Sequence, residues 1–169
     1  MNKTLKLMLF LAIVSAISGL SIGIVNKFTE PIINENAIAS EKKNLDVIYP
    51  GANFIPINYV DDEGIIIGAY KAEGKGYIFK ATATGFNSST PIIVLIGLDN
   101  DGTVVNVIDL QQAETSNYGS HCFEKDNINK LYIDKNVNEE PDMYSGATLT
   151  STAMKTMIIK AQEAFGKVK

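Results

Sequence analysis

The sequence of 169 residues contains no arginine and no tryptophan, and it has one cysteine, Cys122, and one histidine, His121. A single cysteine excludes an internal disulfide, and the adjacent Cys–His pair falls short of the roughly four ligands that zinc needs. Without arginine, no guanidinium group is available to bind a phosphate through two parallel hydrogen bonds. A phosphate-bearing ligand must therefore be held by covalent attachment, backbone N–H groups, hydroxyl groups or lysine.

Features of two other protein classes are also absent. The chain has a formal net charge of −4 and a pI of about 5.0, without an evident basic patch, so we predict no nucleic-acid partner. The single histidine and the lack of a G-x-S-x-G sequence leave no nucleophile–base pair for a hydrolase. We therefore predict no catalytic residue and no metal ligand, and we interpret Cys122 as an ordinary, partly buried thiol.

The N-terminal segment is predicted to lie in a membrane. Leu7 to Val25 carries no charge over 19 residues, about the length of a helix that crosses a bilayer. Lys3 and Lys6 precede it, which favours a cytoplasmic N-terminus and an exported C-terminal part. A cleavable signal peptide, cut after Val14-Ser15-Ala16, is the alternative, although the apolar run continues well past that point.

We therefore divide the chain into residues 1–30, a cytoplasmic N-terminus with one transmembrane helix, and residues 31–169, an extracytoplasmic domain. This domain is predicted to be α+β, an antiparallel sheet with helices packed on it. Alternating or apolar stretches indicate the strands, and the sequence Asn-Asp-Gly at residues 100–102 provides a turn between the last two. Strands are expected over Ile65–Tyr70, Gly76–Thr84, Pro91–Leu98 and Thr103–Leu110.

Helices are expected on both sides of these strands in the sequence. An amphipathic helix over Ala37–Tyr49 should stop at Pro50-Gly51. The segment Ile128–Ile133 is ambiguous between helix and strand. Apolar residues at three- and four-residue spacing predict a final helix from Thr150 to Phe165 that stops near Gly166.

Small and hydroxyl-bearing residues precede this final helix, where residues 142–148 read Asp-Met-Tyr-Ser-Gly-Ala-Thr. Thr148 offers an alcohol oxygen for a phosphoester, and Gly146 and Ala147 are small enough for an enzyme to approach the backbone closely. Thr148 is expected just before or at the helix start, where unpaired N–H groups and a partial positive charge suit a phosphate. The alternative is that Ser145 to Thr150 only caps the helix.

Residues 142–148 resemble the D-x-x-[ST]-G-A-T signature of the FMN-binding subunits of bacterial Rnf and sodium-pumping quinone oxidoreductase complexes. In that family the final threonine carries FMN through a phosphoester that a dedicated flavin transferase installs. The resemblance therefore implies covalent FMN on Thr148. The compact length, the N-terminal span and the exit sequence Phe28-Thr29-Glu30-Pro31-Ile32 are closer to the RnfG-type subunit than to the longer sodium-pump counterpart.

A second block, Gly85 to Gly119, is similar to the family's central region, in which an E-T-P-G-L-G loop lines the flavin ring. Here the loop reads Glu-Thr-Ser-Asn-Tyr-Gly over residues 114–119, so its Glu, Thr and last Gly match. Tyr118 replaces the leucine and is either a ring that stacks on the flavin or a surface residue. Phe86 and Tyr144 are similarly open between flavin wall and core. The resemblance implies a cofactor site that comprises Thr148, Asp142, Ser145, Gly146, Ala147, Thr150, Glu114, Thr115, Tyr118 and Gly119.

The resemblance implies a covalent-FMN electron carrier in a membrane-bound, ion-translocating ferredoxin:NAD oxidoreductase of the Rnf type. The chain would be an electron-transfer subunit rather than a stand-alone catalyst. Its partners would be the other membrane subunits and, during maturation, the flavin transferase. Two alternatives stay open, a flavin carrier for extracellular electron transfer and a cofactor-free, membrane-anchored binding domain.

Overall fold

The computed structural model describes residues 3, 6–8, 10–16, 41–59, 61–136 and 139–169. The chain divides into two units, Met1–Lys42 and Lys43–Lys169. In the first unit residues 6–8 and 10–16 are helical, and residues 9 and 17–25 of the predicted span lie outside the described residues, as does the predicted boundary at residue 30. Within the part of the chain that is described, no helix combines the length and apolar character needed to cross a membrane.

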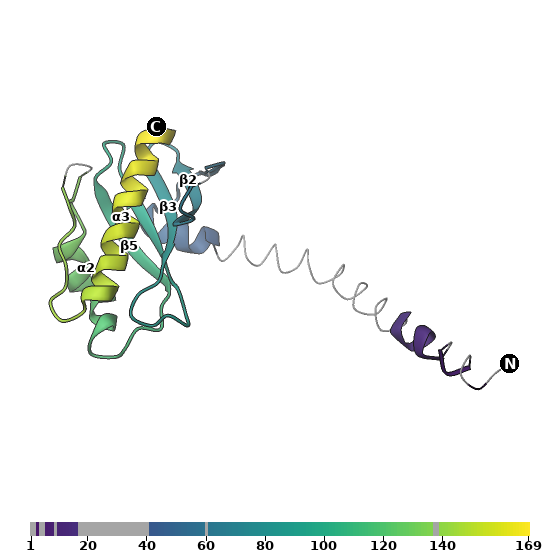
Figure 1. The fold of residues 1–169 in the computed structure, drawn as a ribbon. Helices are drawn as coiled ribbons and strands as arrows, with labels where there is room; N and C mark the ends of the chain where they lie inside the picture. Colours follow the sequence, from purple (N-terminus) through teal and green to yellow (C-terminus); the bar gives the residue numbers. More distant parts are fainter. Residues whose placement is uncertain (1–2, 4–5, 9, 17–40, 60, 137–138) are drawn as a thin grey trace. The chain divides into compact units, whose positions relative to one another are not determined.

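The second unit is built on an antiparallel sheet whose five strands lie side by side in chain order (Figure 1). Each strand returns beside the one before it, so every pairing is between neighbours in the sequence. The strands are β1 (Phe54–Ile57), β2 (Ile66–Ala72), β3 (Gly76–Ala83), β4 (Ile92–Leu98) and β5 (Val104–Gln111). The predicted α+β class and antiparallel sheet are confirmed.

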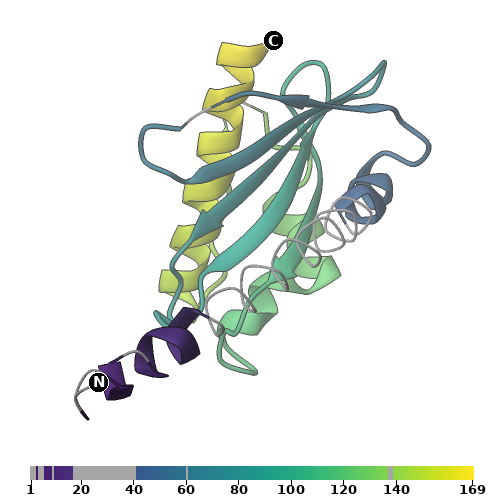
Figure 2. The same cartoon turned by 90° about the vertical axis from the view of Figure 1, so that its right-hand side faces the viewer.

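One long helix, α3 (Thr148–Val168), runs along one face of this sheet, as Figure 2 shows from the side. Two short helical segments, η1 (Gly119–Phe123) and α2 (Lys125–Leu131), follow β5 in the chain. Of the helix predicted over Ala37–Tyr49, residues 41–48 are helical and precede β1, and residues 37–40 lie outside the described residues. The helix ends at a turn over residues 49–51, as Pro50-Gly51 predicted.

The core has two layers because the central strands are buried on both faces. Phe79 of β3 packs with Met154 and Ile158 of α3 in the larger cluster. The next residue, Ile78, points to the opposite face and packs with Leu45 from the helix over residues 41–48. Side chains of successive strand residues alternate between faces, which explains why β3 and β4 are almost continuously apolar.

The structure corrects the predicted elements at three places. β1 was not predicted, since Pro56 lowers the strand signal, but β1 is an edge strand and such strands tolerate proline. The ambiguous segment Ile128–Ile133 falls mainly in α2. The last helix extends two residues past the predicted stop near Gly166, to Val168, and the N–H of Lys169 bonds the Phe165 carbonyl at 3.1 Å.

Candidate functional site

The predicted attachment residue opens helix α3. Thr148 is the first residue of the helix, as expected from the sequence, and it is exposed. Gly146, two residues earlier, has a φ of +90°, a conformation that glycine adopts far more readily than other residues. The residue that flanks the helix start is Ala147, and no side chain makes a capping hydrogen bond there. The capping explanation for the hydroxyls of this segment is therefore wrong.

A buried serine fixes the backbone that leads to Thr148. The hydroxyl of Ser151 lies 2.9 Å from the Tyr144 N–H and 3.3 Å from the Tyr144 carbonyl, so it ties the motif to the first turns of α3. The Cys122 Sγ lies 3.4 Å from the same hydroxyl. The His121 ring stacks on the Tyr144 ring, with 5.7 Å between the ring centroids. Segment 142–147 is thereby held against η1. Sequence reasoning missed Ser151, which looks like any helix serine.

The sequence predicts a partly buried Cys122, but in the structure this residue is fully buried. Its Sγ contacts the buried Ser151 hydroxyl, and Tyr132 in the same part of the core is equally buried. Burial raises the pKa of the Cys122 thiol, which keeps it in its unreactive, protonated form. The residue contributes to the packing behind the motif and is not accessible to reagents in the folded protein.

Glu114 is buried and lies at the junction of three segments. Its carboxylate accepts hydrogen bonds from the backbone N–H groups of Phe86 and Asn87, both at 3.1 Å, and from the Thr150 hydroxyl. Only 7% of the residue is exposed. Glu114 is therefore not a solvated surface acid.

The loop over residues 114–119 keeps a glycine-like conformation despite its altered sequence. Asn117 stands where the resembled loop has glycine and has a φ of 64°, a value that asparagine tolerates better than most residues. Tyr118 follows it with 65% of its surface exposed. Gly119 is not among the glycines with positive φ; instead, a Cβ there would lie 2.7 Å from oxygens of both Glu114 and Thr150.

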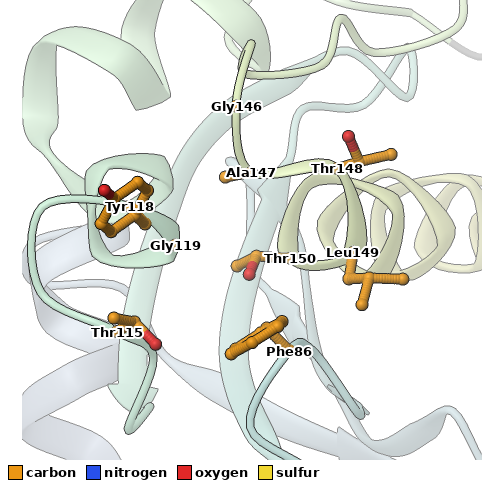
Figure 3. A pocket seen from close by; sticks show the side chains of 9 residues that line it. All are labelled: Phe86, Thr115, Tyr118, Gly119, Gly146, Ala147, Thr148, Leu149 and Thr150. Carbon is orange, nitrogen blue, oxygen red and sulfur yellow. The ribbon is translucent and has the colours of Figure 1, made fainter.

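These segments enclose a pocket of about 370 Å³, within the range of roughly 300–1,000 Å³ that small-molecule sites span. Figure 3 shows Tyr118 on one side of it and Thr148 with Leu149 on the other. The walls are mainly apolar, with three threonine hydroxyls and no lysine among them. The lining residues are Phe86, Thr115, Tyr118, Gly119, Gly146, Ala147, Thr148, Leu149 and Thr150.

Seven of the ten predicted site residues line this pocket, and three do not. Glu114 lies behind the wall. Ser145 is exposed and is not part of the lining, and Asp142 forms an ion pair with Lys135 at 3.2 Å instead. The prediction also left out Leu149. No signal in the sequence marks it, because Leu149 continues the four-residue spacing of the buried Ala153 and Met157, and only the structure shows that it is 58% exposed.

The fold and the pocket together define a domain that can hold a flat, phosphate-bearing cofactor beside a helix start. Residues 85–163 match the sequence model of the FMN-binding domain. The matched region contains β4, β5 and most of α3. It also contains nearly all of the two pocket loops, the segments 84–91 before β4 and 112–118 after β5. No curated protein matches the chain. The match supports an FMN-binding domain family, FMN as the cofactor and a flavin-binding role in electron transfer.

Proposed function

We propose that this protein carries FMN esterified through its phosphate to the Thr148 hydroxyl. On this proposal it relays electrons as a membrane-anchored subunit of an Rnf-type complex. The observation that carries the proposal is the position of Thr148, an exposed hydroxyl at the edge of the pocket, inside the region that matches the FMN-binding domain. The finer assignment to an RnfG-type subunit rests on the resemblance of residues 142–148 and 114–119.

The phosphate end of FMN fits the start of α3. The helix has 21 residues, and its first internal hydrogen bond runs from the Ser151 N–H to the Ala147 carbonyl at 2.9 Å. The N–H groups of the residues before Ser151 therefore have no helical carbonyl to bond. They carry the partial positive charge of the helix end and can bind phosphate oxygens. This arrangement can replace the guanidinium group that the sequence lacks.

The ring end of FMN fits the aromatic walls of the pocket. Phe86 and Tyr118 come from different loops, and they expose 64% and 65% of their surface. A flat aromatic ring packed against them would bury apolar surface and make the offset contacts that aromatic pairs prefer. The Thr115 hydroxyl also lines the pocket and can bond the polar edge of such a ring, and Thr150 Oγ1 can accept a hydrogen bond there while it donates its own to Glu114.

The flavin supplies the electron chemistry when bound, and this chain supplies its attachment, walls and position. We propose an N-terminal transmembrane helix over Leu7–Val25, with Lys3 and Lys6 on the cytoplasmic side and the flavin domain outside. The proposed partners are the other membrane subunits of the complex and the flavin transferase that acts on Thr148.

Intact-protein mass spectrometry of the chain, purified from its host or co-expressed with a flavin transferase, tests the attachment. We expect a mass increase of one FMN less one water that survives denaturation. Thr148→Ala should abolish it, and the matched control Thr152→Ala, an exposed threonine on the same helix, should retain it. Covalent flavin that persists in Thr148→Ala would show that another residue is the attachment site.

A second experiment tests the place of the protein in a complex. An affinity tag after Lys169, used on detergent-solubilised membranes of the host, should co-purify other integral membrane subunits with ferredoxin- or NAD-linked redox centres. Purification of the flavinylated chain alone would instead support an independent flavin carrier. Recovery of the full-length chain in the soluble fraction would contradict the membrane anchor.

A further inference from the structure

We propose that Glu114 is a positioning residue that clamps the two pocket loops to α3 and holds a negative charge behind the pocket, so that it lowers the reduction potential of the flavin. The inference rests on the proposed function and extends it to a residue that does not line the pocket. The resemblance implied that Glu114 contacts the flavin with the rest of its loop. The structure instead places its carboxylate on the other side of the wall.

The clamp joins segments that are far apart in the sequence. The Phe86 and Asn87 N–H groups lie 28 and 27 residues away from Glu114, and the Thr150 hydroxyl lies 36 residues away. Phe86 and Thr150 both line the pocket, so the carboxylate connects two of its walls directly. Removing the acceptor would leave all three donors without their partner, which is most costly for the buried Thr150 hydroxyl, since the two N–H groups are only partly buried.

Two glycines make room for the carboxylate. A Cβ on Gly85 would lie 2.5 Å from Oε1 of Glu114, and a Cβ on Gly119 would lie 2.7 Å from Oε2. Both distances are far below ordinary van der Waals contact, so the backbone on either side closes tightly on this side chain. Glu114 is thus held in one place, as a group that tunes a neighbouring cofactor must be.

The charge of the carboxylate is stabilised by hydrogen-bond donors and not by a neighbouring cation. The three hydrogen bonds are all donated to it, which is the pattern of an ionised carboxylate, a group that can only accept. None of the ion pairs formed by the described residues involves Glu114. A flavin gains negative charge on reduction, and a fixed negative charge behind its pocket disfavours that state.

The test compares Glu114→Gln with wild type in the flavinylated, full-length protein in detergent. Glutamine keeps the shape and one acceptor oxygen but removes the charge. The matched control is Glu163→Gln, an exposed acid on α3 about 22 Å along the helix axis from Thr148. Reductive titration at pH 7 against dyes of known potential gives the midpoint potential of each protein.

We expect Glu114→Gln to raise the ratio of reduced to oxidised flavin at a fixed potential by about tenfold, a shift of about 30 mV for a two-electron couple. Glu163→Gln should leave the ratio unchanged. An unchanged or lowered potential in Glu114→Gln would overturn the proposed charge effect.

Hydrogen exchange in the protein without flavin tests the clamp separately. The amides of Phe86 and Asn87 should exchange faster in Glu114→Gln than in wild type, and at the wild-type rate in Glu163→Gln. Unchanged exchange at both amides in Glu114→Gln would refute the clamp. A wild-type protein that never acquires flavin would refute the proposed function, while this measurement would still decide the clamp.

Discussion

Replacement of Gly119 by alanine tests the most tightly packed point of the site. The new Cβ would lie 2.7 Å from Oε2 of Glu114, 2.7 Å from Oγ1 of Thr150 and 3.0 Å from the Glu114 Cβ. Rotation of one carboxylate oxygen cannot relieve all three contacts, because the third atom belongs to the root of the side chain. Glu114 must therefore move as a whole, and its hydrogen bonds to Phe86 and Asn87 would break.

The size of the effect follows from those bonds. Hydrogen bonds to a charged group contribute roughly 1.5–3 kcal/mol each, and part of this loss is recovered if the displaced carboxylate reaches water. We expect a loss of about 2–3 kcal/mol in the free energy of unfolding. At about 4 °C per kcal/mol for a domain of this size, the Tm should fall by roughly 8–12 °C. Gly119→Val should lose more, for reasons of space and not because of a positive φ.

Thermal unfolding of the full-length chain, followed by circular dichroism in detergent, measures this effect. The matched control is Gly166→Ala, since a Cβ at Gly166 meets nothing within 4 Å and the residue lies within α3. Alanine is the better helix former by up to about 1 kcal/mol, so the control should be neutral or slightly stabilised.

A double-mutant cycle identifies the cause of the loss. A Glu114→Ala background lacks the Oε2 atom and the hydrogen bonds that Gly119→Ala would disrupt, while the contacts with Thr150 Oγ1 and with the Cβ of residue 114 remain, so Gly119→Ala should cost less there than in wild type. Equal costs in the two backgrounds would show that Gly119 acts independently of Glu114. A wild-type Tm for Gly119→Ala would show that the junction is loosely packed, contrary to the distances.

Three further predictions concern the pocket wall, the opposite face of the sheet and the membrane topology. Tyr118→Leu should keep flavin attached to Thr148 but raise its fluorescence and change its midpoint potential, because the exposed ring would no longer stack on the flavin; unchanged values of both would make Tyr118 an ordinary surface residue. Burial and the nearby Asp99 carboxylate raise the pKa of Tyr49 from 10.0 to about 12, so the stability that this residue contributes is complete below pH 10 and is lost as the pH rises towards 12. Tyr49→Phe removes the titrating hydroxyl and its 2.8 Å hydrogen bond to the Leu98 carbonyl, so the Tm of the variant should fall less between pH 9 and 12 than the Tm of wild type. An equally steep fall in the variant would rule Tyr49 out as the source of the pH dependence. Lys167→Cys adds an exposed thiol to a chain whose own Cys122 is buried. An impermeant maleimide should label this thiol in intact cells, after the outer membrane is permeabilised where there is one. Labelling only after lysis would reverse the proposed orientation.

The strands were predictable where local pattern and turn chemistry agreed. β4 and β5 flank the Asn-Asp-Gly turn, and their pairing in antiparallel register follows from a short loop. β1 was not predictable, because its side chains are mostly half-buried or exposed and Pro56 interrupts it. Its pairing with β2 depends on a long connection through residues 58–65, for which the local sequence carries no signal.

In the site, sequence reasoning found seven of the nine residues that line the pocket and missed Ser151, which holds the backbone before Thr148. Thr148 and Gly146 stand out because a reactive hydroxyl and a small residue have a local signature. Ser151 does not, since its role depends on Tyr144 seven residues earlier and on Cys122 twenty-nine residues earlier. Such contacts arise only when α3 packs on the sheet and brings η1 beside its first turns.

The pocket is formed by a helix and by loops, and the two are held in place by different interactions. Thr148 lies on α3, which the apolar core holds in place through Met154, Met157 and Ile158. The aromatic walls lie on loops, which have little apolar surface to bury and would otherwise move. A buried carboxylate can fix such loops because it bonds backbone N–H groups directly, whatever their side chains are. This permits the wall to vary, as in the replacement of leucine by Tyr118, while its backbone stays in place. Changes to Glu114 or Gly119 should therefore disturb the pocket more than changes to the rings that line it.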